Sequence, residues 1–229
     1  MNIDEIQTAL QQEDFQYRLK AISALKTYAS EVAVPILLRS VEDREFLVRT
    51  FVAMGLGQKN TAESFAALLQ MMKLDDTPSV RAEAANSLSL FGRVAVSHLV
   101  QAFVQDDHWL VRRSILAAIA ELDCPEDFYE VCLQGLAGQD ATVYESSIDG
   151  LGLLAQTSKR SEALEQLLEL YRSQDVRTRQ RVAYALKRFD DCQAKRTLIE
   201  LRQDPDYRVV AAALEELLEV SVPGAEGVD

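Results

Sequence analysis

One short motif occurs seven times in this chain of 229 residues. In each copy an acidic residue precedes a Val-Arg-like pair, and small or apolar residues follow three, six and seven positions after the pair's second residue. That second residue falls at positions 18, 49, 81, 112, 144, 179 and 210, so the copies are 31, 32, 31, 32, 35 and 31 residues apart. A period of about 20 to 50 residues is typical of solenoids, whose repeats bury their apolar faces against one another.

Each copy predicts a pair of helices. Offsets of three and seven share one helical face, and the small residue at offset six lets a neighbouring helix approach closely. The motif Asp precedes its helix, as an N-cap does. Second amphipathic runs lie between the motifs at 32–41, 64–74, 94–104, 128–136 and 163–171, with Pro35 near the start of the first. We therefore expect an all-α fold, a right-handed α-solenoid of about seven helical hairpins in one domain over 1–220, and a flexible tail over 221–229.

Charge and cysteine content exclude several classes of function. Lys and Arg total 24 against 36 Asp and Glu, a formal net charge of -12, which disfavours nucleic acids and anionic membranes as partners. Cys124, Cys132 and Cys192 are odd in number and form no C-x-x-C motif, so a disulfide framework is not expected. With no apolar run of 18 residues and no basic, apolar leader, the sequence predicts a soluble, cytoplasmic protein without a membrane span.

The most typical copies read DDHWLVRR at 106–113 and DDTPSVR at 75–81. They resemble HEAT repeats, and their short period and position at the head of a helix are most similar to the phycobilisome-lyase HEAT-like family. The resemblance covers residues 4–220. Tyr144 and Val210 replace the arginine, so an Asp–Arg ladder along the stack should be interrupted there.

This resemblance implies a non-catalytic protein that recognises phycobiliproteins and assists phycobilisome degradation or pigment detachment, with no resident cofactor and at most a transient bilin contact. It is similar in this respect to the phycobilisome degradation proteins of that family. Two alternatives stay open. The chain could be a phycocyanobilin lyase subunit that attaches or removes a bilin, or a general interaction scaffold such as an iron–sulfur assembly adaptor.

Variable positions on the motif helices are the candidate partner-binding residues, because this helix lines the concave face in similar solenoids. Exposed aromatic, Met and Arg side chains are typical of partner surfaces. The candidates are Phe46, Leu47, Phe51, Met54, Trp109, Leu110, Arg113, Arg177, Arg181, Tyr184 and Arg188. The alternative is that the apolar ones extend the core, and that the basic ones are a solvated face paired with Glu162, Glu165 and Glu169.

No metal site or catalytic residue is predicted. His98 and His108 are the only histidines, and neither precedes a Glu, so the His-Glu pairs of similar HEAT-repeat di-iron hydroxylases are missing. Cys124 and Cys132 flank a turn at Pro125 and are either small core residues or ligands of a cluster shared with a partner. We interpret the motif Asp and Arg residues as structural, since residues that recur in every repeat suit stacking better than a single site.

Overall fold

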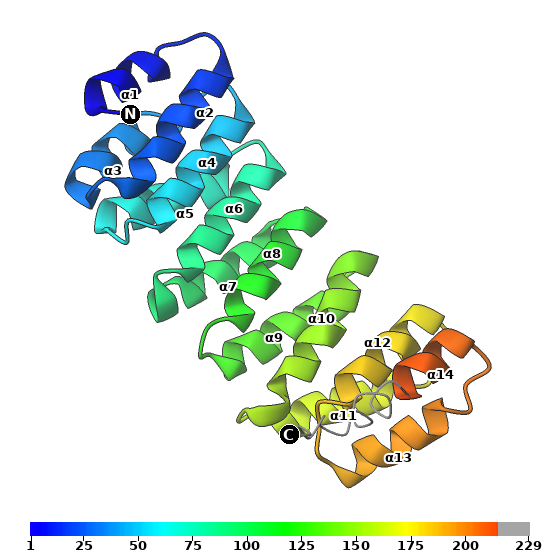
Figure 1. Ribbon diagram of the computed structural model, residues 1–229. Coiled ribbons are helices and arrows are strands. Elements are labelled where there is room, and N and C mark those ends of the chain that lie inside the picture. Colours follow the sequence, from blue (N-terminus) through cyan, green and yellow to red (C-terminus); the bar gives the residue numbers. More distant parts are fainter. Residues whose placement is uncertain (215–229) are drawn as a thin grey trace, which may run out of the picture. The chain divides into compact units, whose positions relative to one another are not determined.

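A computed structural model describes residues 1–214 of the chain, and the predicted tail at 221–229 lies outside them (Figure 1). The described residues form fourteen α-helices and three short 3-10 helices, with no β-strand among them. The α-helices are α1 Ile3–Leu10, α2 Phe15–Ala24, α3 Ser30–Leu38, α4 Phe46–Gly57, α5 Ala62–Leu74, α6 Pro78–Ser89, α7 Val96–Gln105, α8 Trp109–Ala120, α9 Pro125–Leu136, α10 Ala141–Leu153, α11 Arg160–Leu170, α12 Val176–Leu186, α13 Cys192–Leu201 and α14 Tyr207–Leu214. This confirms an all-α solenoid of helix pairs, whose handedness stays a prediction.

All seven motifs fall on even-numbered helices, from α2 to α14, and the odd-numbered helices supply the second member of each pair. The contacts of the chain cluster into two compact units, Met1–Asp127 and Phe128–Asp229, called here the N-terminal and the C-terminal unit. The expectation of one repeat domain over 1–220 stays a prediction.

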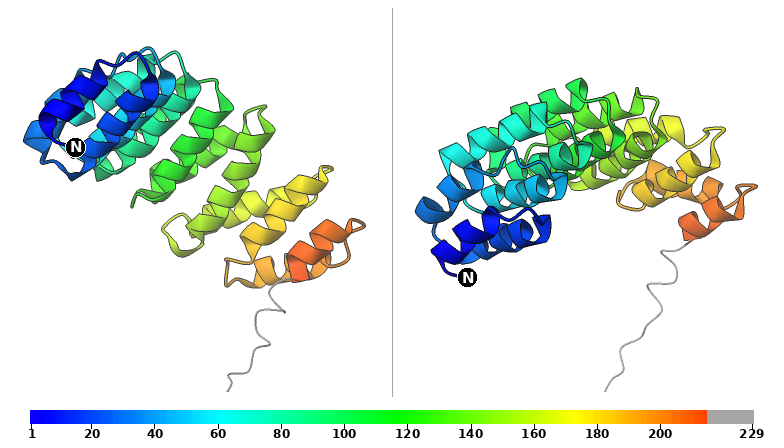
Figure 2. Two further views of the ribbon diagram at one scale, coloured as in Figure 1. Left: turned by 45° about the horizontal axis from the view of Figure 1, so that its top comes forward. Right: turned by 90° about the horizontal axis from the view of Figure 1, so that it is seen from above.

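In the N-terminal unit the motif helices α2, α4, α6 and α8 lie side by side, as the two views of Figure 2 show. The residues at offset seven, Leu25, Leu56, Leu88 and Ile119, are each at most 1% exposed. The residues at offset three are buried as well, namely Ala21, Val52, Ala84 and Ile115. Because full burial of one Leu or Ile contributes about 1.5–3 kcal/mol, this repeated stripe accounts for much of the stacking free energy.

The C-terminal unit uses the same positions in α10 and α12, and the offset-three residue of α14, Ala213, is buried as well. Leu151 and Leu186 occupy offset seven and are fully buried. Gly150 occupies offset six of α10, where a Cβ would lie 2.6 Å from Cys132 Sγ of α9. The small residue expected at offset six is therefore needed for the close approach of the two helices of that pair.

The start of α3 differs from the prediction. The helix begins at Ser30, so Pro35 is its sixth residue and does not lie near its start. Pro35 has no N–H to donate to the carbonyl four residues earlier, that of Glu31. Glu31 is exposed, so water can satisfy this carbonyl, which explains why the helix tolerates the proline.

Candidate functional site

The motif arginines make buried ion pairs between consecutive repeats. Arg18 Nε donates to Asp43 Oδ2 at 2.7 Å, and its Nη2 donates to Oδ1 at 2.9 Å. The same two-point contact joins Arg49 to Asp75, Arg81 to Asp106 and Arg179 to Asp204. The paired side chains are 6–15% exposed. Two parallel, charge-assisted hydrogen bonds in such a shielded place fix the geometry of the stack.

Each of these arginines also donates hydrogen bonds to backbone carbonyl oxygens of the loop before its own helix. Arg18 Nη1 donates to the carbonyl oxygens of Gln12 and Glu13, both at 2.8 Å. The hydrogen bond to Asp43 raises the pKa of the Arg18 guanidinium further, which keeps it charged under all ordinary conditions. The ladder therefore has a structural role, as the sequence predicted.

The acidic partners are not always the motif residues that the sequence singled out. The carboxylates that pair with arginine precede their helix by three residues: Asp75 before α6, Asp106 before α8 and Asp204 before α14. The motif residues Asp76, Asp107 and Asp206 do not occupy this position, although Asp76 Oδ1 accepts a further hydrogen bond from Arg49 Nη2 at 2.8 Å. Asp14, Asp140 and Asp175 are N-caps as expected. The expectation was wrong for α4, α6 and α8, whose N-cap residues are Glu45, Thr77 and His108.

The ladder is interrupted within the part of the chain that the structure describes. Tyr144 occupies the arginine position of α10 and cannot form an ion pair. Ser173 occupies the matching aspartate position, three residues before α12, so both members of this ion pair are replaced. Arg112 keeps the cation, but its buried Nε has no hydrogen-bond partner, and its guanidinium lies 4.4 Å from the Phe103 ring centroid. Gly138 occupies the carboxylate position before α10. The interruption at Tyr144 was predicted, whereas that at Arg112 was not.

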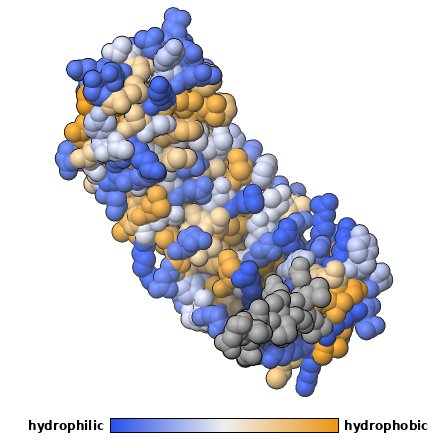
Figure 3. Space-filling view, viewed as in Figure 1, coloured by the Kyte–Doolittle hydropathy of each residue, from blue (hydrophilic) through white to orange (hydrophobic). Residues whose placement is uncertain are grey.

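The predicted apolar residues of α4 lie at the surface. Phe46, Leu47, Phe51 and Met54 are 36–42% exposed, although they belong to a helix whose opposite face is fully buried. Figure 3 shows hydrophobic side chains interrupting the polar surface of the N-terminal unit. These four residues, the α4 patch, are therefore available for contact with another molecule.

Trp109 lies at the first position of α8 and is 42% exposed. Its ring stacks on that of His108, with centroids 5.9 Å apart. His108 Nδ1 also accepts a hydrogen bond from Leu110 N–H at 3.2 Å, which fixes the imidazole at the start of the helix. Leu110 is half-buried and Arg113 is exposed. The histidine therefore positions the tryptophan at the start of α8.

The basic residues predicted on α12 are largely neutralised. Arg181 bonds to Asp149 at 3.0 Å and approaches Glu145 at 3.4 Å, while Arg177 lies 3.8 Å from Glu145. These carboxylates come from α10, so the pairing predicted with Glu162, Glu165 and Glu169 of α11 was wrong for Arg177 and Arg181. Burial raises the pKa of Asp149, and the charge of Arg181 opposes this shift.

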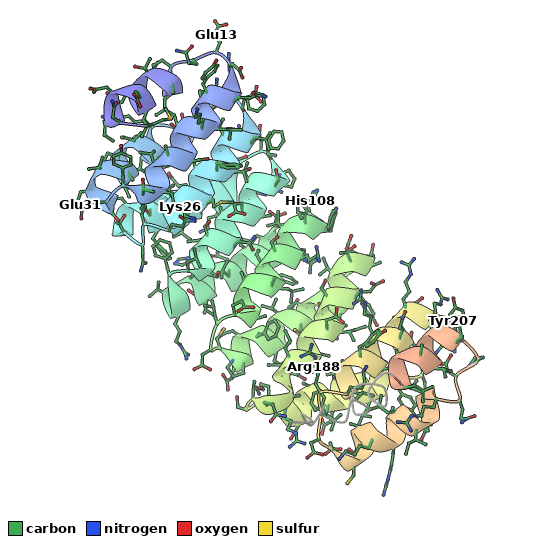
Figure 4. All side chains as sticks on the ribbon, viewed as in Figure 1. Glu13, Lys26, Glu31, His108, Arg188 and Tyr207 are labelled. Atoms are coloured by element: carbon green, nitrogen blue, oxygen red, sulfur yellow. The ribbon has the colours of Figure 1, made fainter. Side chains whose placement is uncertain are left out.

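The remaining residues of this basic group differ in exposure. Tyr184 is half-buried, with Lys187 Nζ 4.7 Å from its ring centroid. Arg188 is exposed, and Figure 4 labels it just beyond the end of α12. The α12 surface therefore offers two exposed guanidinium groups, that of Arg188 and that of Arg177, whose side chain is 72% exposed although it lies near Glu145.

Cysteines and histidines form no metal site in residues 1–214. Cys124 and Cys132 are buried and Cys192 is exposed. Burial raises the pKa of the Cys132 thiol far above its ordinary value, so it stays protonated. His98 packs against Phe65, with ring centroids 5.8 Å apart. No group of three His, Cys, Asp or Glu side chains that could hold a metal ion occurs among the described residues. None of the described helices is both long and apolar enough to cross a membrane.

Comparison with known proteins gives a consistent result for the fold. The family of HEAT repeats matches residues 41–120 and 129–219. Deoxyhypusine hydroxylase-B from Oryza sativa subsp. japonica is 30% identical over 114 residues, which are 49% of this chain and 38% of the relative. The chain thus matches about two fifths of the length of that curated relative.

Two solved structures match this chain over most of its length. The complex of CpcE and CpcF of phycocyanin lyase from Nostoc sp. PCC7120 contains a chain that is 19% identical, with a TM-score of 0.53, covering 97% of this chain and 89% of that one. Human deoxyhypusine hydroxylase in complex with glycerol is 17% identical, with a TM-score of 0.44, covering 94% of each chain. The similarity to the chain of the phycocyanin lyase complex, at 19% identity, shows a shared fold alone.

Proposed function

Because this chain belongs to the HEAT-repeat family, we propose that it is a non-catalytic binding protein that recognises phycobiliprotein subunits and assists phycobilisome degradation or pigment detachment. The observation that carries this proposal is the α4 patch together with Trp109, all exposed on motif helices of one unit. Large apolar and aromatic side chains at the surface are typical binding hot spots.

The family resemblance supplies the class of partner. The uninterrupted repeats and the size are similar to those of the phycobilisome degradation protein NblB, and the fold is shared with the phycocyanin lyase complex of Nostoc. The action is recognition, followed by loosening of the contact between a subunit and its neighbours or its bilin. Arg113 is the polar part of this proposed surface in the N-terminal unit. The other predicted residues, Arg177, Arg181, Tyr184 and Arg188, are proposed as a separate binding surface of the C-terminal unit. We propose the cytoplasm as its location.

Binding of purified phycocyanin tests this proposal. Phe51→Ala and Trp109→Ala should each weaken binding about fivefold or more, because truncation of an interface anchor costs about 1–4 kcal/mol. Tyr207→Ala is the matched control, since Tyr207 is an aromatic residue that is 79% exposed on α14 of the other unit. Absence of binding by the parent protein, or equal effects of Trp109→Ala and Tyr207→Ala, would contradict the proposal.

A second candidate is a subunit of a phycocyanobilin lyase, favoured by the fold shared with the Nostoc lyase complex. Mixing this chain with bilin and apo-phycocyanin, with and without a second HEAT-like subunit, separates the two functions. Covalent fluorescence that requires this chain would establish the lyase function over the first proposal. The iron–sulfur adaptor is less well supported, because Cys192 is the one exposed cysteine of the three.

A further inference from the structure

A small apolar pocket opens beside the α4 patch in the N-terminal unit. It lies between the C-terminal ends of α2 and α4 and includes part of the 3-10 helix Leu25–Thr27. Its volume is about 120 Å³. Its apolar wall is formed by Ile22, Leu25, Leu37, Phe51, Met54 and Gly55. An apolar cavity of about 150 Å³ is large enough to bind benzene, so this pocket has room for one large apolar side chain.

The sequence keeps this space open through Gly55. A Cβ there would lie 3.1 Å from Leu37 Cδ2, which already fills the floor of the pocket. Phe51 is 36% exposed and Met54 is 39% exposed, and they form part of the mouth. An incoming side chain would therefore cover apolar surface that now faces water, which is a favourable exchange.

Two lysines line the same pocket. Lys59 Nζ donates to the carbonyl oxygens of Lys26 at 3.0 Å and Tyr28 at 2.6 Å. Lys26 is exposed in the 3-10 helix that follows α2, and Figure 4 labels it. Within residues 1–214 neither ammonium group has a carboxylate within 4.0 Å. In a chain with a formal net charge of -12, two cations without an acidic partner beside an apolar pocket indicate a site for an external anion.

We propose that this pocket binds an amphipathic helix of a partner protein, inserting one Leu-, Met- or Phe-sized side chain and placing a carboxylate one turn away against Lys26 and Lys59. The inference rests on the proposed binding function and specifies the recognition element of the partner. The apolar anchor supplies affinity, and the two ammonium groups select an acidic helix over a basic one.

Two synthetic helical peptides of 16 residues provide the test. Both carry Leu on one face, and one has Glu and the other Lys one turn from each Leu. Fluorescence anisotropy should show that the Glu peptide binds at least about tenfold more tightly than the Lys peptide. Lys26→Glu should weaken the Glu peptide about tenfold and strengthen the Lys peptide. Ser23→Trp, which places an indole on a lining residue of the pocket, should abolish binding of both.

Lys73→Glu is the matched control, because Lys73 is an exposed lysine on α5 that does not line the pocket. Equal effects of Lys26→Glu and Lys73→Glu, unchanged binding by Ser23→Trp, or no binding of the Glu peptide would each overturn the proposal. Light scattering that shows a dimer dissociated by Lys26→Glu would assign the pocket to a second copy and overturn it as well. Peptide binding without phycocyanin binding would reject the proposed function alone, whereas the reverse result would reject the pocket alone.

Discussion

The helices α4 and α12 carry opposite chemistry at equivalent positions of the repeat. Phe51 and Arg181 both lie two residues after the motif arginine, and Met54 and Tyr184 both lie five residues after it. In α4 these positions expose apolar side chains, whereas Arg181 is held by an ion pair with Asp149. The repeat therefore fixes which positions face outward, and the residues placed there are free to differ between the units.

The two units also differ in how their repeats are linked. Three buried Arg–Asp pairs join consecutive motif helices of the N-terminal unit, and one such pair, Arg179–Asp204, occurs among the described residues of the C-terminal unit. The residues at offset seven that the structure describes are buried and apolar in both units. Apolar stacking at this position is thus common to the two units, and the ion pairs are an addition that one unit uses more than the other.

The largest effect is expected from breaking one bridge of the N-terminal unit. Arg49→Ala leaves the Asp75 carboxylate, whose side chain is 6% exposed, without its cation. Loss of one partner of a buried ion pair costs about 3–5 kcal/mol, so the free energy of unfolding should fall by this amount. Trp109, the only tryptophan, lies in this unit, and its fluorescence in urea would report the transition.

Arg177→Ala is the comparison in the C-terminal unit, because the Arg177 side chain is 72% exposed and makes only a long ion pair. An exposed ion pair contributes about 0–1 kcal/mol. Equal losses for Arg49→Ala and Arg177→Ala would show that the buried ladder does not hold the N-terminal unit together.

A smaller effect is expected at two equivalent glycines. Gly57 and Gly152 both lie eight residues after the second residue of their pair. A Cβ on Gly57 would lie 2.7 Å from Ser87 Cβ, and one on Gly152 would lie 3.0 Å from Ala185 Cα. Alanine at either position should lower the free energy of unfolding of its unit by about 1–2 kcal/mol, because overpacking outweighs the gain in helix propensity.

Urea denaturation of the two glycine variants, each compared with the parent, measures these losses. A loss at Gly57 with none at Gly152 would show that the helices of the C-terminal unit can separate without cost. That result would contradict the view that apolar stacking is equivalent in the two units.

The missing bridge of the C-terminal unit can be rebuilt. Tyr144→Arg with Ser173→Asp places both members of the ion pair at their repeat positions, three residues before α12 in the case of Ser173. The change in the free energy of unfolding of the double variant should exceed the sum of the changes in the two single variants by about 1 kcal/mol. A double-mutant cycle in chemical denaturation measures this coupling free energy. A coupling free energy of zero would mean that this junction differs in geometry from the others.

The smallest effect is expected on the loss of stability at low pH. The hydrogen bond from Arg179 lowers the pKa of Asp204, against the opposing effect of burial. A carboxylate with a lowered pKa in the folded state stabilises the protein above its unfolded pKa of about 3.9, and this contribution is lost as the pH falls through the folded value. Asp204→Asn should therefore flatten the decline of stability below about pH 4.

The loss of helical circular dichroism in urea, recorded at pH 6 and at pH 3, measures this difference. The parent should lose more stability between the two pH values than Asp204→Asn does. An identical pH dependence of the two proteins would show that the Arg179–Asp204 pair contributes nothing to folding.

The sequence predicted the parts of the fold that follow from helical periodicity. The offsets three and seven correctly located buried residues such as Val52 and Leu56, because one helix face has to be apolar for stacking. The prediction was less accurate where it had to choose between two neighbouring acidic residues as the partner of an arginine. Asp75 and Asp76 are chemically identical, and only the loop geometry decides that Asp75 meets Arg49 most closely.

The surface contacts were predicted less completely, because they depend on how the helices pack. Exposure of Phe51 and Trp109 follows from their helical offset. The partners of Arg181 do not, because Asp149 is brought to it by the packing of α10 on α12, 32 residues away in sequence. The pocket between α2 and α4 also depends on the packing of helices and left no recognisable motif.

Each complete repeat carries both halves of the joining device: an aspartate that receives the arginine of the preceding repeat, and an arginine that reaches the aspartate of the following one. Duplication of a single segment such as residues 43–74 would therefore create matched junctions on both sides without any further substitution. An array built from such segments can therefore lengthen by one repeat at a time without any new chemistry at its junctions.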